Sequence, residues 1–150
     1  MAQSLTKIVV HVVFSTKNRE PCLSKTIRDD LFAYVVGILK SLNCITLIIN
    51  GTEDHVHALI AMSKTISLSK MMEEMKGGSS RWLNSQTVMS RHFSWQAGYG
   101  AFSVSESQIS KVIDYIANQE EHHRKTTFRE ELILLLKKHN IEFDEQHLWA

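Results

Sequence analysis

His55 and His57 stand one residue apart, directly after Asp54. On an extended strand successive side chains alternate between the two faces, so both imidazoles would project from one face while Val56 points into the opposite layer. Such a pair forms a two-pronged ligand for a metal ion. If the pair stands alone, the simpler interpretation is that both histidines are merely polar residues at the entrance of a strand. A third ligand is needed to favour a site.

A candidate third ligand lies on a helix predicted after residue 105. Residues 105–108 have capping-box spacing. An apolar stripe follows them, made of Ile109, Val112, Ile113 and Ile116. Tyr115 and Gln119 are four residues apart, so on a helix they stack on one ridge beside this stripe. A phenol and an amide oxygen would then face the same cleft.

Length and composition bound the class of protein. A chain of 150 residues that is 43% hydrophobic fits one globular domain, residues 1–150. The first residues lack a basic and then apolar signal, and no apolar run is long enough to cross a bilayer. We therefore expect a cytoplasmic protein without a membrane partner. Cys22 and Cys44 lack the spacing of a disulfide framework or a thiolate zinc site.

Charge points to a local basic surface and excludes a general polycation, because the net charge is only +1. Between residues 64 and 91 the positive side chains are Lys64, Lys70, Lys76, Arg81 and Arg91, against Glu73 and Glu74. An ordinary solvated helix face remains the alternative. Lys17 and Arg19 follow the first strand, on a loop where they could meet phosphates or serve as surface charges.

Hydrophobic periodicity predicts the first half of the fold. A β-branched strand spans residues 7–15 and contains His11, which we expect to be a hydrogen-bonded core residue. A helix over 25–42 and a strand over 44–49 follow, and Asn50-Gly51 predicts a hairpin turn into the histidine strand. A second helix starts near Ser67. Its Gly77-Gly78 pair implies a kink, a break or a close approach.

The second half begins with an aromatic and glycine-rich loop that leads into a strand at 101–103. In this loop Trp95 and Tyr99 could stack on unpaired bases or could pack onto the core. The cluster at 122–125 is explained without a metal, as cations at a helix C-terminus. A last helix ends at Asn140, and its apolar positions are Phe128, Leu132, Leu135 and Leu136.

This order of elements predicts an α+β fold, a ferredoxin-like split βαβ sandwich with an antiparallel sheet and added C-terminal helices. The histidine strand would be central, and Gln119 could approach His55 and His57. Two imidazoles and one amide make a neutral site with open positions. Mg²⁺ or Mn²⁺ fits if phosphate oxygens complete the shell, and Zn²⁺ stays open. A site without its own negative charge suits an anionic substrate such as a phosphodiester.

The chain resembles the single-tyrosine HUH transposases, the IS200-like class that moves insertion sequences as single-stranded DNA. The matching motifs are His55-Val56-His57 and residues 115–119, with support from residues 13–17, residues 95–100 and Asp144. The resemblance covers essentially the whole chain. It implies that His55, His57 and Gln119 hold a divalent ion, and that Tyr115 is the nucleophile in a transesterification that leaves a 5′-phosphotyrosine.

The resemblance also implies a homodimer in which the tyrosine helix of one subunit completes the histidine site of the other. A hairpin DNA end would bind on a basic surface. The candidate DNA contacts are Lys17, Arg19, Lys70, Lys76, Arg81, Arg91, Trp95 and Tyr99. No general base for the phenol can be named from the sequence.

Three other functions remain open. A domesticated relative that processes repeated hairpins would have much the same site. A non-catalytic nucleic-acid-binding module of ferredoxin-like fold is a second alternative, although the strands lack an exposed aromatic pair. A metal-dependent phosphodiesterase, with water in place of tyrosine, is the third.

Overall fold

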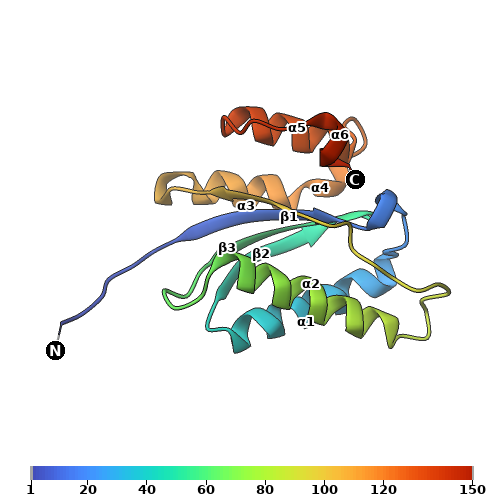
Figure 1. The fold of residues 1–150 in the computed structure, drawn as a ribbon, viewed down its shortest axis with the longest axis horizontal. Helices are drawn as coiled ribbons and strands as arrows, with labels where there is room; N and C mark the ends of the chain where they lie inside the picture. The colour runs from blue at the N-terminus through green and yellow to red at the C-terminus, as the bar shows by residue number, and fades with distance from the viewer. Residues whose placement is uncertain (1, 150) are drawn as a thin grey trace.

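A four-stranded antiparallel sheet lies between two layers of helices in the computed structural model, which describes residues 2–149 (Figure 1). The strands are β1 (Val9–Ser15), β2 (Ile45–Gly51), β3 (His55–Ala61) and β4 (Gly100–Ser103). Their order in the sheet is β2-β3-β1-β4, and every neighbouring pair is antiparallel. The predicted ferredoxin-like α+β fold is confirmed, with the histidine strand β3 in the interior of the sheet.

Helices cover both faces of this sheet. One face carries α1 (Lys25–Ser41) and α2 (Leu68–Asn84), and the other carries the later helices (Figure 1). These are α3 (Ile109–Ala117), α4 (Gln119–His122), α5 (Phe128–Lys138) and α6 (Glu145–Leu148), with single 3₁₀ turns η1 (Lys17–Arg19) and η2 (Glu106–Gln108). Apart from the helix predicted after residue 105, the ends of the predicted elements differ from these bounds by one or two residues.

The apolar core lies between the sheet and the pair α1 and α2. Alternate residues of the two central strands enter it, namely Val10, Val12 and Phe14 from β1 and Val56, Ala58 and Ile60 from β3. Period-2 alternation therefore sends the other half of each strand to the opposite face. That half includes His11, His55 and His57.

The predicted turn at Asn50-Gly51 is wrong, because β2 continues through Gly51 and the chain reverses at residues 52–54. The glycine serves another purpose. A Cβ atom there would lie 2.2 Å from the His55 carbonyl oxygen. Gly51 thus allows the two strands to approach closely just where the histidine strand begins.

The Gly77-Gly78 pair lies in an uninterrupted α2. Of the three predicted explanations, close approach is confirmed, since a Cβ at Gly78 would lie 2.8 Å from Ile38 Cδ1 of α1. The glycine lets the two helices pack tightly against each other.

The capping box predicted at residues 105–108 does not form. The Ser105 side chain makes no cap hydrogen bond, and η2 precedes α3 instead. A complete capping box is found at Thr127 and Glu130, where it begins α5.

The tyrosine helix also differs from the prediction, because it is not continuous. It ends at Ala117, and α4 starts at Gln119 after Asn118 leaves helical geometry.

Among residues 2–149, no helix combines the length and apolarity that a membrane span requires.

Candidate metal centre and nucleophile

His55 and His57 project from the same face of β3, as strand alternation predicts, and both are fully buried. In the sheet register they lie opposite Ser15 and Val13 of β1. Helices α3 to α5 cover this face, so the two imidazoles sit inside a closed polar layer.

A carboxylate orients the His55 ring. Its Nδ1 lies 2.7 Å from Asp54 Oδ1 and 2.9 Å from Thr52 Oγ1. An ionised carboxylate only accepts hydrogen bonds, so Nδ1 donates to Asp54 and the ring turns Nε2 towards the centre of the cluster. This is the outer support that metal-binding histidines usually have. Nε2 of His55 lies 3.3 Å from Gln119 Oε1.

The His57 ring lies between another histidine and a carboxylate. Its Nδ1 is 2.7 Å from His11 Nε2, and its Nε2 is 2.8 Å from Glu131 Oε1. Burial lowers the pKa of His57 to about 4 and that of His11 to about 3. Both rings are therefore neutral at pH 7, as imidazole ligands must be. His11 is the hydrogen-bonded core residue that the sequence predicted.

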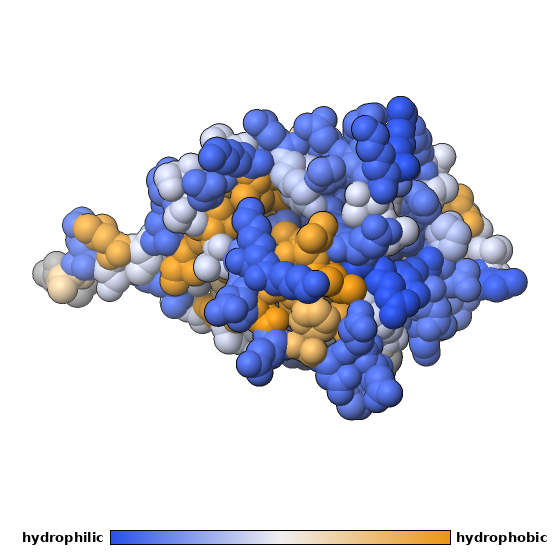
Figure 2. Space-filling model, turned by 90° about the horizontal axis from the view of Figure 1, so that it is seen from above, coloured by the Kyte–Doolittle hydropathy of each residue, from blue (hydrophilic) through white to orange (hydrophobic). Residues whose placement is uncertain are grey.

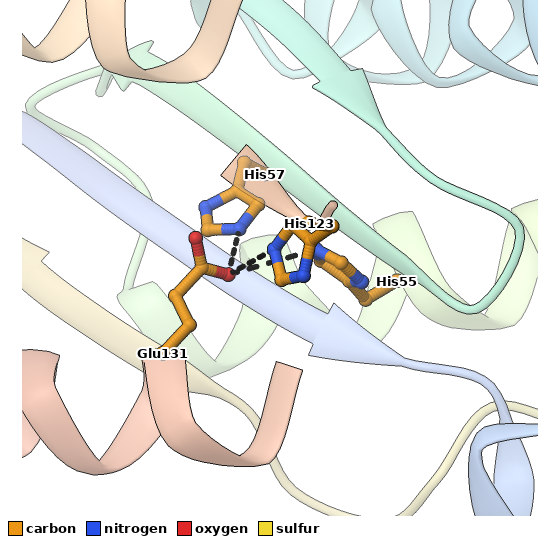
Figure 3. Close-up of side chains that lie close together, drawn as sticks. All are labelled: His55, His57, His123 and Glu131. Carbon is orange, nitrogen blue, oxygen red and sulfur yellow. Dashed lines mark hydrogen bonds and ion pairs between the residues drawn. The ribbon is translucent and has the colours of Figure 1, made fainter. Parts of the chain in front are cut away.

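Glu131 of α5 places one carboxylate oxygen among three imidazoles (Figure 3). Its Oε1 lies 2.8 Å from His57 Nε2, 3.1 Å from His123 Nε2 and 3.6 Å from His55 Nε2. Burial by itself would raise the pKa of Glu131, but hydrogen bonds from His123 and His57 outweigh it and hold this pKa below its usual range. Glu131 is therefore ionised, and it compensates charge in a buried layer.

These four side chains can hold a metal ion. One ligand atom each of His55, His57, His123 and Glu131 lies within 4.8 Å of the others, and three of the four residues are buried. Three imidazoles and one carboxylate form a borderline donor set suited to a divalent transition metal. The predicted set had no carboxylate, whereas this group includes Glu131. It also includes His123, from the 122–125 cluster that the sequence explained without a metal.

Tyr115 reaches the same carboxylate from α3, because its hydroxyl donates a short hydrogen bond to Glu131 Oε2. Burial, and then this bond, raise the pKa of Tyr115 well above its usual range. The phenol is thus protonated at neutral pH. The Glu131 side chain lies between this hydroxyl and the three imidazoles, and all of these residues belong to one chain.

Gln119 reaches the histidine cluster although the helix predicted to carry both Tyr115 and Gln119 is interrupted at Asn118. Its side chain is buried, its Oε1 faces His55 Nε2, and its Nε2 donates to the Tyr115 carbonyl at 3.4 Å. The structure therefore brings together all four of the site residues predicted at 55, 57, 115 and 119.

The candidate DNA contacts lie elsewhere and fall into two groups. Lys17, Lys70, Arg81, Arg91 and Tyr99 are exposed. Within this group Lys70 Nζ pairs with Glu74 Oε1 at 3.1 Å. Lys76 and Arg19, which are less exposed, contact other parts of the chain. Lys76 Nζ donates to the carbonyls of Gln96 and Gly98, at 2.8 and 2.6 Å, and the Arg19 guanidinium lies over the Trp149 ring.

Trp95 packs onto the core, which was one of the two predicted alternatives. Its ring contacts Phe14 and Phe93 edge to face, and its Nε1 donates to Ser79 Oγ. Its faces are consequently not offered to bases in this conformation. Stacking on Tyr99 stays a prediction.

Glu131 was missed at the sequence level, although one signal was present. It occupies an apolar stripe of α5 whose other members are Phe128, Leu132 and Leu135. A carboxylate in a stripe that faces the core must find partners there, and this makes it a candidate functional residue. No comparable pattern distinguishes His123 from its neighbours in the sequence.

Comparison with known proteins gives one family and two related folds. The family described as "Transposase IS200 like" matches residues 4–119. The crystal structure of a "putative transposase" from Deinococcus radiodurans is 23% identical, with a TM-score of 0.62, over 79% of this chain and 98% of that chain. A REP-associated tyrosine transposase bound to a REP hairpin is 13% identical, with a TM-score of 0.63, over 82% and 73%. No curated protein matches.

The family match divides the site. His55, His57, Tyr115 and Gln119 lie within residues 4–119, whereas His123 and Glu131 follow them. The last two ligand candidates are thus contributed by the segment that the family description does not cover.

Proposed function

Since the chain belongs to the family of IS200-like transposases, we propose that it cleaves and rejoins single-stranded DNA through a covalent phosphotyrosine at Tyr115. Cleavage takes place at hairpin-marked ends and needs a divalent metal ion. The hairpin is proposed because a protein of similar fold is bound to one.

One observation carries this proposal. The Tyr115 hydroxyl and three imidazoles contact opposite oxygens of the same buried carboxylate, Glu131. A phenol so close to a cluster of metal-ligand type is expected of a nucleophile that attacks a phosphate held beside that cluster. The other two tyrosines, Tyr34 and Tyr99, are exposed and have no such neighbours.

The first step exchanges one ester for another. A bond forms between Tyr115 Oη and phosphorus, and the bond from phosphorus to the 3′ oxygen breaks. The phenol loses one proton and the departing 3′ oxygen gains one. In the second step a 3′-hydroxyl attacks the phosphotyrosine and reverses these changes, so no ATP is needed.

Glu131 fills the role that the sequence left empty. The reference pKa of tyrosine is about 10, and burial raises that of Tyr115 further, so the phenol needs a proton acceptor. Glu131 Oε2 already accepts its hydrogen bond, which is the geometry expected of a general base.

The metal site consists of His55, His57, His123 and Glu131, with the Gln119 oxygen next to His55 as a fifth donor. When bound, a divalent ion supplies Lewis acidity to the non-bridging phosphate oxygens. Mg²⁺ and Mn²⁺ both suit phosphate chemistry. Three imidazoles favour Mn²⁺ or Zn²⁺ over Mg²⁺, which prefers oxygen ligands.

The homodimer implied by the resemblance remains a prediction. The tyrosine helix need not come from the partner subunit, because an active site within one chain is the alternative. Tyr115 contacts Glu131 of its own chain, so one chain holds the full set of proposed site residues. Mixing Tyr115→Phe with His57→Ala protein tests this point, because sites completed by a partner would recover activity and self-contained sites would not.

Incubation of the protein with labelled hairpin-bearing single-stranded DNA and Mn²⁺ tests the function. A DNA-linked protein band should appear on a denaturing gel, and Tyr115→Phe or a chelator should remove it. Tyr34→Phe is the matched control and should keep the band. A hydrolase would cleave without the band and survive Tyr115→Phe, whereas a binding module would shift the DNA without cleaving it.

Domestication is a second candidate role, favoured by the REP-associated protein of similar fold. Such a protein would act on hairpins repeated in a genome and leave its own gene in place. The two roles share the chemistry, and they differ in whether the hairpins that are cleaved flank the gene or lie dispersed.

A further inference from the structure

A cavity of about 760 Å³ opens between α3, α5 and the end of β4. Viewed onto these helices, the molecule shows apolar side chains gathered in a hollow with hydrophilic residues around it (Figure 2). The apolar lining is made by Val104, Val112, Leu134 and Leu135. Leu134 is 63% exposed, so most of its side chain is accessible to a bound molecule.

This cavity reaches the proposed reaction centre. Tyr115 and Glu131 are both part of its lining. A molecule held in it would therefore lie next to the phenolic oxygen.

Its charges are predominantly positive. Lys111 and Lys138 line the cavity with exposed side chains, and His122 and His139 stand beside them. Glu131 is the sole acidic residue among the lining residues identified in the described part of the chain, and its carboxylate already faces imidazoles. An apolar wall with cations at the edge complements a base attached to phosphates.

We infer that this cavity binds the nucleotide next to the scissile phosphate of single-stranded DNA. Its base packs against Val112 and Leu134, and its phosphates face Lys111 and Lys138. The volume lies within the range of small-molecule sites, roughly 300–1,000 Å³, and accommodates one nucleotide. This inference rests on the proposed function, whose site it extends by a binding pocket for the substrate.

The outer wall comes from α5, beyond the family match at residues 4–119. Leu134, Leu135 and Lys138 belong to this helix. The C-terminal segment therefore contributes one wall of the pocket, and this wall can set which base is accepted beside the cleavage point.

Photo-crosslinking locates the nucleotide without requiring catalysis. Full-length Tyr115→Phe protein is mixed with a pool of random single-stranded oligonucleotides that carry 4-thiothymidine, irradiated, digested and analysed by mass spectrometry. Adducts should lie on peptides from residues 103–112 or 134–139. Adducts confined to other surfaces, or no adducts at all, would overturn the inference.

Binding measurements give a second, independent test with fluorescein-labelled oligonucleotides from the same pool. Leu134→Glu should raise the Kd about tenfold, because it removes an apolar contact with the base and adds a charge that repels phosphate. Val88→Glu is the matched control, since Val88 is equally exposed, at 63%, and lies outside the cavity. A second copy of the chain as the true occupant would show as a changed oligomeric state with an unchanged Kd.

Salt dependence tests the lysines. Lys111→Ala with Lys138→Ala should flatten the plot of log affinity against log salt by about 1.4, at roughly 0.7 per phosphate contact on a single strand. Lys137→Ala, on the same helix but outside the cavity, should leave the slope unchanged. Equal slopes for all variants would count against the inference.

The two hypotheses fail in different ways. If the wild-type protein forms no DNA adduct on any hairpin substrate, the proposed function fails, whereas crosslinks in the cavity would still stand. If the protein cleaves DNA while Leu134→Glu shows unchanged KM, Kd and crosslinks, the cavity inference fails and the proposed function stands.

Discussion

The two faces of the sheet differ although the same two strands build them. Towards α1 and α2, β1 and β3 present only apolar side chains, such as Phe14 and Ile60. Towards α3 to α5 they present His11, His55 and His57 beside a smaller apolar set. Strand alternation thus separates the two tasks, because the face that provides most hydrophobic burial need not carry buried charge.

The apolar face of the sheet explains how a small domain tolerates a buried polar cluster on the other face. Ionised Glu131 and the histidines around it are costly to bury, and their cost is limited by mutual hydrogen bonds. The larger core on the opposite face is available to offset the remainder. Variants on the two faces should therefore fail differently.

The largest loss of stability is expected on the apolar face. Phe14 is buried and packs edge to face on Trp95. Phe14→Ala should lower the free energy of unfolding by about 3–5 kcal/mol. Urea denaturation measures this, and cleavage per folded molecule should persist at low temperature. Equal loss of activity and stability would contradict the separation of the two faces.

On the polar face, Glu131→Gln should cost about 3 kcal/mol at pH 7, because it breaks a buried charge cluster. The pKa of Glu131 is depressed in the folded chain, so its charge contributes stability above the unfolded pKa of about 4.3 and loses that contribution as pH falls below it. The gap between wild type and variant should therefore narrow below pH 4. A gap that does not depend on pH would mean that packing, and not charge, is responsible.

Metal binding should stabilise the protein only when the ligands on the polar face are intact. At a concentration 100 times the Kd, Mn²⁺ or Zn²⁺ should add about 2.7 kcal/mol to the free energy of unfolding. The rise in melting temperature should vanish with a chelator and in His57→Ala, while Phe14→Ala should keep it. If added metal did not change the melting temperature of the wild-type protein, the proposed metal centre would be contradicted.

The smallest expected effect concerns the helix that carries Glu131. Thr127→Ala removes the capping box of α5 and should cost about 1 kcal/mol. Ser105→Ala is the matched control and should leave the free energy of unfolding unchanged, since the Ser105 side chain makes no cap hydrogen bond. If both variants behaved alike in thermal denaturation, the structural capping assignment would be wrong.

Local patterns predicted much of this molecule. The alternation through residues 55–57 placed both imidazoles on one face, and the order of strands and helices gave the ferredoxin-like sheet with β3 inside. These features follow from periodicity and from chain order, which are properties of neighbouring residues. The hairpin turn and the first capping box were mispredicted, because close packing at Gly51 and a 3₁₀ turn before α3 replaced them.

The sequence by itself determined that His55 and His57 act as a pair and that Tyr115 and Gln119 accompany each other. Only the tertiary structure decided that Glu131 joins them, 74 residues after His57, and that His123 turns inward. The physical reason is that the rotation and docking of α5 depend on packing against distant strands. A buried carboxylate shows its partners only once that packing is known.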